Sequence, residues 1–173
     1  KHLDVKDKHA TNIGAANCVK LGNKTKGINT DWTGYLNSIK KLKLKKNKKV
    51  LILGYGGAAQ AIVYAFALKG FQNIIVFNRS KKLIKFKEVK AFTKKYSLID
   101  RHLRDADIII NTTPTNPLKK KQMQEVGQKV VVSDIVYKPK QTLFLKGFKK
   151  NRKIYGISML IEQAIPCFRL WFG

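Results

Sequence analysis

Several residue types that would assign a chain to a class of protein are scarce in this one. The 173 residues include two cysteines, Cys18 and Cys167, which lie far apart and within apolar stretches. Two such cysteines form neither a metal-ligand pattern nor a disulfide framework, so we interpret both as small buried residues and predict no metal site. The three histidines, His2, His9 and His102, do not cluster, and we assign no chemistry to them.

Long apolar runs are also missing. No stretch approaches the length of a membrane span, and no signal-peptide pattern opens the chain. We found no internal repeat and no low-complexity linker. The sequence therefore predicts a soluble globular protein of the cytoplasm with no membrane partner. It does not begin with Met and stops just after a predicted helix, so we also expect a fragment of a longer protein.

Acidic residues are few, 10 against 36 lysines and arginines, and the formal net charge is +26. A charge of this size invites a nucleic-acid interpretation. However, the lysines are spread over the whole length, arginines are rare, and no recognition-helix or RNA-binding signature accompanies them. Such a lysine bias, with many Ile and Asn residues, is what an A/T-rich coding sequence produces. We predict anionic small ligands rather than nucleic acid. The alternative from a different functional class is a basic regulatory module that binds nucleotides or nucleic acid.

The most informative segment is a short apolar run, 49–53, followed by a glycine-rich turn and then a helical pattern. This order is typical of a dinucleotide-binding site. Gly54 permits a tight turn, and Gly56 leaves room for a pyrophosphate that a side chain would meet. Ala58 and Ala59 let the helix pack close to the strand, and the helix N-terminus offers unpaired N–H groups to phosphates. A glycine-rich turn that binds no ligand is the alternative.

A second strand, 73–77, follows the helix and gives the segment the length of a βαβ unit. NAD-binding units usually place an acidic residue after this strand, where it holds the ribose 2′-hydroxyl. Arg79 stands there instead, followed by Lys81 and Lys82. A guanidinium suits a 2′-phosphate in charge and geometry, so we predict NADP rather than NAD. The two lysines are equally well explained as part of a generally basic surface.

Strand and helix patterns alternate along the chain, which predicts an α/β fold: a Rossmann-type, mostly parallel sheet with helices on both faces. Ligands of such sheets bind beyond the carboxyl ends of the strands. We therefore expect one crevice lined by the segments 54–56, 78–79, 111–113 and 134–137. Other strands are expected at 15–19, 26–28, 108–111, 130–134 and 153–155, and other helices at 32–41, 83–96, 142–150 and 157–172.

Six motifs follow one another along nearly the whole chain. They are Asn29-Thr30-Asp31, Gly54-Tyr55-Gly56-Gly57-Ala58-Ala59, Asn78-Arg79-Ser80, Asn111-Thr112-Thr113-Pro114, Asp134-Ile135-Val136-Tyr137 and Gly156-Ile157-Ser158-Met159-Leu160-Ile161-Glu162-Gln163-Ala164. In this order they resemble the motif series of shikimate dehydrogenase. The resemblance implies NADPH-dependent, reversible reduction of 3-dehydroshikimate to shikimate, in the pathway to chorismate and the aromatic amino acids. It also implies an N-terminal substrate domain, a C-terminal Rossmann domain and a cleft between them.

The resemblance further implies roles for single residues. Asp31 matches the catalytic aspartate, which would orient the substrate hydroxyl and keep a partner lysine protonated. Arg79 matches the residue on the 2′-phosphate. The implied substrate-binding residues are Asn17, Asp31, Tyr137 and Gln163. The implied cofactor-binding residues are Gly54, Gly56, Gly57, Ala58, Asn78, Arg79, Ser80, Lys81, Asn111, Thr112, Val136, Gly156 and Met159.

Plainer interpretations exist for the three polar residues of the substrate site. Asp31 could simply cap a helix, and Asn17 and Gln163 could be ordinary hydrogen-bonded residues. The structure has to distinguish these from the catalytic interpretation.

The sequence departs from the family pattern in several places. The catalytic lysine and the serine-containing segment that binds the substrate carboxylate normally precede Asn17, and neither is in this chain. We therefore expect weak or no turnover from this fragment alone. Trp32, Cys18, Tyr55 and Leu83 also differ from the residues common in the family at these positions. These differences leave open a quinate/shikimate dehydrogenase that uses NAD.

The expected organisation follows from the same resemblance. Residues 1–31 would be a remnant of the N-terminal α/β substrate domain, and residues 32–156 the NADP-binding domain. Residues 157–173 would form a helix that returns towards the substrate domain. A homodimer is one open arrangement of the whole protein.

Overall fold

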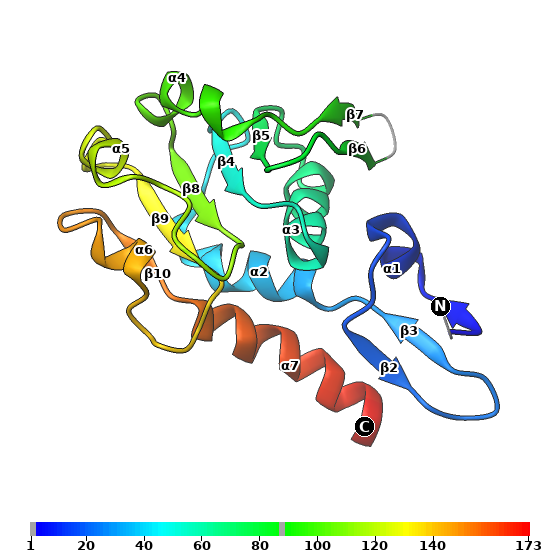
Figure 1. The fold of residues 1–173 in the computed structure, drawn as a ribbon. Helices are drawn as coiled ribbons and strands as arrows, with labels where there is room; N and C mark the ends of the chain where they lie inside the picture. Colours follow the sequence, from blue (N-terminus) through cyan, green and yellow to red (C-terminus); the bar gives the residue numbers. More distant parts are fainter. Residues whose placement is uncertain (1–2, 87–88) are drawn as a thin grey trace.

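The structure is a computed structural model that describes residues 3–86 and 89–173. Its centre is a parallel sheet of five strands in the order β10-β9-β8-β4-β5 (Figure 1). The strands are β4 (Val50–Leu53), β5 (Ile74–Phe77), β8 (Ile108–Asn111), β9 (Val131–Asp134) and β10 (Lys153–Ile154). The predicted parallel sheet is confirmed, and the strand at 108–111 has the predicted bounds.

The central strands are apolar at nearly every position because both faces of the sheet are covered. In β4, Val50 and Ile52 belong to one core cluster, whereas Leu51 and Leu53 belong to the cluster on the other face. All four of these residues are fully buried. This alternation places helices on both sides of the sheet, as predicted.

Three longer helices share the first core cluster, and three short ones lie on the side of the second. Helix α7 (red in Figure 1) runs from the end of β10 past α2 towards the N-terminal part. None of the helices in the described ranges is long and apolar enough to cross a membrane. The longer helices are α2 (Asp31–Ile39), α3 (Gly57–Leu68) and α7 (Gly156–Phe172), and the short ones are α4 (Asp100–Leu103), α5 (Lys120–Gln124) and α6 (Leu143–Lys146).

The N-terminal part forms a small separate sheet in the order β1-β3-β2. Its elements are β1 (Val5–Lys6), α1 (Lys8–Ile13), β2 (Cys18–Lys20) and β3 (Lys26–Ile28). Strands β2 and β3 pair antiparallel; β3 has the bounds predicted for it, whereas the strand predicted at 15–19 begins only at Cys18. Among the contacts that attach this part to the rest, His9 of α1 stacks on Trp32 at a ring separation of 4.5 Å, and Trp171 Nε1 donates to the Val19 carbonyl at 3.0 Å.

The prediction of a helix over 83–96 is wrong for the residues of this stretch that the structure describes. The chain forms an antiparallel pair, β6 (Leu83–Phe86) and β7 (Val89–Phe92), and then a 3-10 turn (Tyr96–Leu98). Leu83 is half exposed while its neighbour Ile84 is buried, as the period of a strand requires. A short run of mixed apolar and polar residues fits both the helical and the strand period. The pairing of the two segments with each other therefore determined which structure formed. Residues 87 and 88, within the predicted helix, lie outside the described ranges.

Two further predicted elements are shorter than expected. The helix predicted over 142–150 is reduced to α6, which begins after Thr142, whose hydroxyl accepts from Leu145 N at 3.2 Å. The strand predicted at 153–155 ends at Ile154, because Tyr155 is already the residue before α7.

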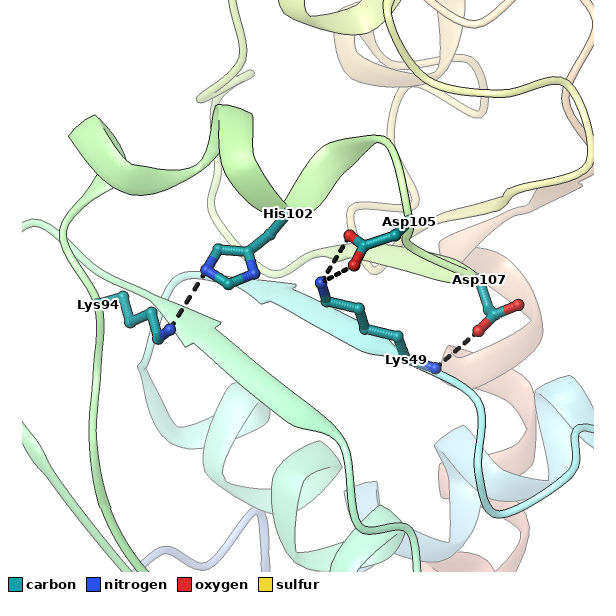
Figure 2. A network of polar contacts seen from close by, with 5 residues as sticks. All are labelled: Lys49, Lys94, His102, Asp105 and Asp107. Carbon is teal, nitrogen blue, oxygen red and sulfur yellow. Dashed lines mark hydrogen bonds and ion pairs between the residues drawn. The ribbon is translucent and has the colours of Figure 1, made fainter.

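A polar network fastens the start of β4 to the segment around α4 (Figure 2). Lys49 Nζ lies 2.6 Å from both carboxylate oxygens of Asp105, and Lys49 N donates to Asp107 at 2.8 Å. His102 Nε2 lies 3.2 Å from Lys94 Nζ. Burial lowers the pKa of His102 below its usual 6.5, and the nearby charges of Lys94 and Lys49 lower it further.

This network predicts a loss of stability in mild acid. As the pH falls through 6.5, the unfolded chain protonates His102 before the folded chain does, so the free energy of unfolding falls with the pH. His102→Gln should flatten this dependence, and Lys94→Met, which removes a repelling charge, should weaken it. Urea unfolding at several values between about pH 7.5 and pH 5 measures the effect. An identical pH dependence in wild type and His102→Gln would contradict the assignment.

Candidate active site

The glycine turn after β4 packs tightly against the loop after β8. Gly54 has a φ of +98°, a conformation that residues with a side chain rarely adopt. A Cβ on Gly54 would lie 2.7 Å from Thr112 Oγ1 and 2.8 Å from Thr113 Cγ2. Thr112 Oγ1 in turn donates to the Leu53 carbonyl at 2.7 Å. These contacts hold the carboxyl ends of β4 and β8 together at the place where the strand order reverses, which is the usual ligand crevice of such sheets.

The N-terminus of α3 opens onto solvent beside this turn. Gly56, the residue before the helix, has no heavy atom within 4 Å of the position a Cβ would take, and no side chain caps the helix. Gly57 is also exposed, and Ala58 is half-buried. Ala59 is buried, which lets α3 pack closely on the sheet. The free N–H groups of this twelve-residue helix therefore face open space, as a phosphate site requires.

A cavity of about 670 Å³ lies in front of the turn. Arg79 and Lys82 are its basic residues, and Asn78 lines it beside them. Its lining residues are Gly54, Tyr55, Gly56, Asn78, Arg79, Lys82, Tyr96, Thr112, Thr113, Pro114, Thr115 and Pro117.

Two residues predicted beside Arg79 have other contacts. The backbone and hydroxyl of Ser80 accept from Asn78 Nδ2 at 3.0 and 3.3 Å, so Ser80 shapes the turn. Lys81 Nζ lies 4.4 Å from the centre of the Phe92 ring. Lys82, rather than Lys81, therefore lines the cavity together with Arg79.

Asn111 is buried, and its amide is fully engaged within the protein. Its Nδ2 donates to the carbonyls of Thr113 and Thr115 and to Asp134, and its Oδ1 accepts from Thr113 N at 3.1 Å. The side chain therefore fixes the loop after β8 instead of pointing at a ligand. Burial raises the pKa of Asp134. The hydrogen bonds that it accepts from Thr142, the Val136 amide and Asn111 oppose this shift.

Asn17, Asp31 and Gln163 meet at one point, although they come from three separate segments. Asn17 Nδ2 donates to Asp31 Oδ1 at 2.9 Å and to Gln163 Oε1 at 3.0 Å. Thr30 holds the group from behind: its Oγ1 accepts from Asn17 Nδ2 at 2.9 Å and donates to Gln163 Oε1 at 3.3 Å. Asn17 is exposed, and Asp31 and Gln163 are half-buried, so a small polar ligand can reach all three.

The carboxylate of Asp31 does not cap α2. Asp31 lies inside the first turn, and Asn29 Oδ1 accepts from the Asp31 backbone N–H at 3.1 Å. Burial raises the pKa of Asp31, while the hydrogen bond from Asn17 opposes that shift. A half-buried carboxylate with a raised pKa and one open side is suited to accept a proton or a hydrogen bond from a ligand.

The two cysteines are buried, as predicted, and both adjoin this polar group. Thr30 Oγ1 lies 3.2 Å from Cys167 Sγ. Burial raises the pKa of Cys18 to about 12, and the contact with the Cys167 thiol is the second cause of this rise. Cys18 therefore stays protonated at neutral pH and acts as a packing residue.

The polar group adjoins the glycine turn. The Cβ of Ala15, two residues before Asn17, lies 3.6 Å from where a Cβ on Gly57 would be. At the start of α7, a side chain on Gly156 would collide with the carbonyls of Ile135 and Val136. The turn after β4 thus borders the polar group, and the loop after β9 borders the start of α7, the helix that carries Gln163.

The two remaining predicted residues differ in exposure. Tyr137 is half exposed at 50%, whereas Met159 is buried in the core at 7%. Sequence reasoning missed Tyr96, Thr115 and Pro117, which line the cavity. No local motif marks them.

Comparison with known proteins identifies the family. The model of the family described as shikimate/quinate 5-dehydrogenase matches residues 38–139. The shikimate dehydrogenase (NADP(+)) of Nitrosopumilus maritimus is 37% identical over all of this chain and 68% of its own length. The chain belongs to the shikimate/quinate dehydrogenase family. This confirms the resemblance seen in the sequence.

Solved structures of the family share the fold. Shikimate 5-dehydrogenase of Thermus thermophilus, in complex with NADP(H) and shikimate, matches with a TM-score of 0.79 and 27% identity, over 99% of this chain and 67% of that one. Quinate dehydrogenase of Corynebacterium glutamicum, in complex with NAD, matches with a TM-score of 0.79 and 25% identity over the same shares. The predicted Rossmann-type fold is thereby confirmed.

In this family member, α2 and α7 approach each other at Gly34. A Cβ there would lie 2.6 Å from Gln163 Cβ and 2.7 Å from Gln163 N. This backbone nitrogen cannot shift unless the helix that contains it shifts too. Gly34 therefore sets how close Gln163 comes to Asp31.

Gly34→Ala should lower the free energy of unfolding by about 1–3 kcal/mol, because the new methyl group overpacks the helix contact. In an open helix the same change would stabilise. Gly22→Ala, in the connection between β2 and β3, is the control for a glycine with open space, since the nearest atom to its Cβ would be 3.9 Å away. Urea denaturation measures both, and equal effects at the two glycines would contradict the close contact.

Proposed function

We propose that this chain carries the cofactor site and part of the substrate site of an NADP-dependent shikimate dehydrogenase. The enzyme reduces 3-dehydroshikimate reversibly to shikimate. The observation that carries the proposal is the meeting of Asn17, Asp31 and Gln163 beside the glycine turn. The family relatives named for this activity support it.

The residues present fit a dinucleotide phosphate. The open space at Gly56 leaves room for a pyrophosphate against the free N–H groups of α3. Arg79 and Lys82 supply positive charge in the same cavity, where an NAD-binding site would have an acidic residue. When bound, NADPH supplies the hydride for the reduction.

The polar group holds the substrate in this proposal. Hydride addition to a ketone leaves negative charge on its oxygen, which needs a proton or a hydrogen-bond donor. Asp31 accepts a hydrogen bond from the substrate hydroxyl on its open side and orients it. The amides of Asn17 and Gln163 bind neighbouring hydroxyls, and they are already aligned by Thr30.

The function is tested on the full-length protein by following NADPH absorbance during shikimate oxidation, with NAD and quinate as comparators. Turnover with shikimate and NADP supports the proposal. Turnover with quinate and NAD alone would replace it with the alternative enzyme. No turnover with any pair, in a protein shown to be folded, would contradict both.

Asp31→Asn should lower kcat/KM for shikimate by about 100-fold or more, because the neutral amide carries no charge with which to hold the substrate hydroxyl and a protonated partner lysine. Since burial raises the pKa of Asp31, the acid limb of the wild-type pH profile should lie above the ordinary value of 3.8. Asp100→Asn is the control, an exposed carboxylate bound to Gln122 on the far helices. Full activity in Asp31→Asn would overturn the assignment.

Arg79→Gln should raise KM for NADP by about 10- to 100-fold, the range expected for a lost hydrogen bond to a charged group. KM for NAD should change little, because NAD lacks the 2′-phosphate. Arg101→Gln, an exposed arginine of α4 outside the cavity, is the matched control. Equal changes for the two coenzymes would show that Arg79 does not bind the 2′-phosphate.

A further inference from the structure

The chain continues the parallel sheet beyond β5 for a single residue. Lys94 bridges to Phe77 in parallel: Lys94 N donates to the Val76 carbonyl at 2.8 Å, and Asn78 N donates to the Lys94 carbonyl at 2.9 Å. Tyr96 follows two residues later. It therefore stands at the same edge of the sheet as the ends of β4 and β5, where ligands bind.

The side chain of Tyr96 lines the candidate cofactor cavity with Gly54 and Arg79. Its ring packs on Phe77, with 6.2 Å between the ring centres, which limits its movement. Burial raises the pKa of Tyr96, while the nearby Gly54 backbone and the charge of Arg79 oppose this shift. The hydroxyl is thus neutral at physiological pH and lies near both the glycine turn and the arginine.

The hydroxyl of Tyr96 is buried and has no hydrogen-bond partner. The Gly54 backbone N–H, which lies near this hydroxyl, donates to the Phe77 carbonyl at 2.8 Å. Of the buried side-chain atoms left without a partner in the described ranges, this one alone belongs to a residue of the cavity. A buried hydroxyl without a partner is costly, and a ligand oxygen at this place would satisfy it.

We propose that Tyr96 is a further cofactor-binding residue, whose hydroxyl donates a hydrogen bond to a phosphate oxygen of the dinucleotide between the glycine turn and Arg79. This inference rests on the proposed function. Two phosphates of the dinucleotide would lie near such a position: the pyrophosphate at the turn and the 2′-phosphate at Arg79. Both present the same chemistry, an anionic oxygen that accepts from a neutral phenol.

The test is Tyr96→Phe in the full-length protein, with dissociation constants for NADP and NAD measured by calorimetry. NADP should bind about tenfold more weakly or worse. Weakening of NADP alone assigns the bond to the 2′-phosphate, and equal weakening of both assigns it to the pyrophosphate. Tyr155→Phe, which removes the same atom outside the cavity, is the matched control.

Thermal unfolding gives a second readout that does not depend on activity. The unliganded Tyr96→Phe protein should be as stable as wild type or more so, because the variant lacks a buried hydroxyl without a partner. The rise in Tm on adding NADP should be smaller than in wild type. A merely structural hydroxyl would instead lower the Tm of the unliganded protein.

Unchanged binding of both coenzymes to Tyr96→Phe would overturn the inference while leaving the proposed function in place. A wild-type protein that binds neither coenzyme would remove the proposed function itself. The two failures are therefore distinguishable in one set of titrations.

Discussion

The close contact of α2 and α7 at Gly34 is the constraint on which the candidate substrate site depends. With no side chain between the helices, the backbone of Gln163 comes near enough to α2 for its amide to meet Asn17 and Thr30. The same helices cover one face of the sheet, so core packing and the placement of the polar group form a single arrangement. Separating the helices would disturb both at once.

The parallel direction of the strands has the same importance for the cofactor. Because neighbouring strands end at one edge, the turn at Gly54, the basic residue Arg79 and Tyr96 line one cavity. The N-terminal segment reaches the same edge through the contact of Ala15 with Gly57. The candidate substrate and cofactor sites therefore adjoin, and the net charge of +26 favours the approach of anionic ligands to them.

The sequence predicted best those elements whose local pattern allows one structure. The buried strand at 108–111 is one case, because a short run of isoleucines between polar segments suits a covered parallel strand. The stretch from Leu83 to Phe92 is the opposite case, since its residues fit two periods and pairing partners elsewhere decided the outcome. Ser80 and Lys81 were grouped with Arg79 as sequence neighbours, but their side chains take other directions.

The sequence by itself determined the strand–turn–helix unit, the basic residue after β5 and the class of the cofactor, because these depend on residues adjacent in the chain. Only the tertiary structure decided that Asn17 meets Gln163, 146 residues away, and that the Asp31 carboxylate meets Asn17 rather than capping its helix. It also left the buried hydroxyl of Tyr96, a residue that lines the cavity, without a partner. These outcomes depend on how helices pack and strands cross, which no local pattern specifies.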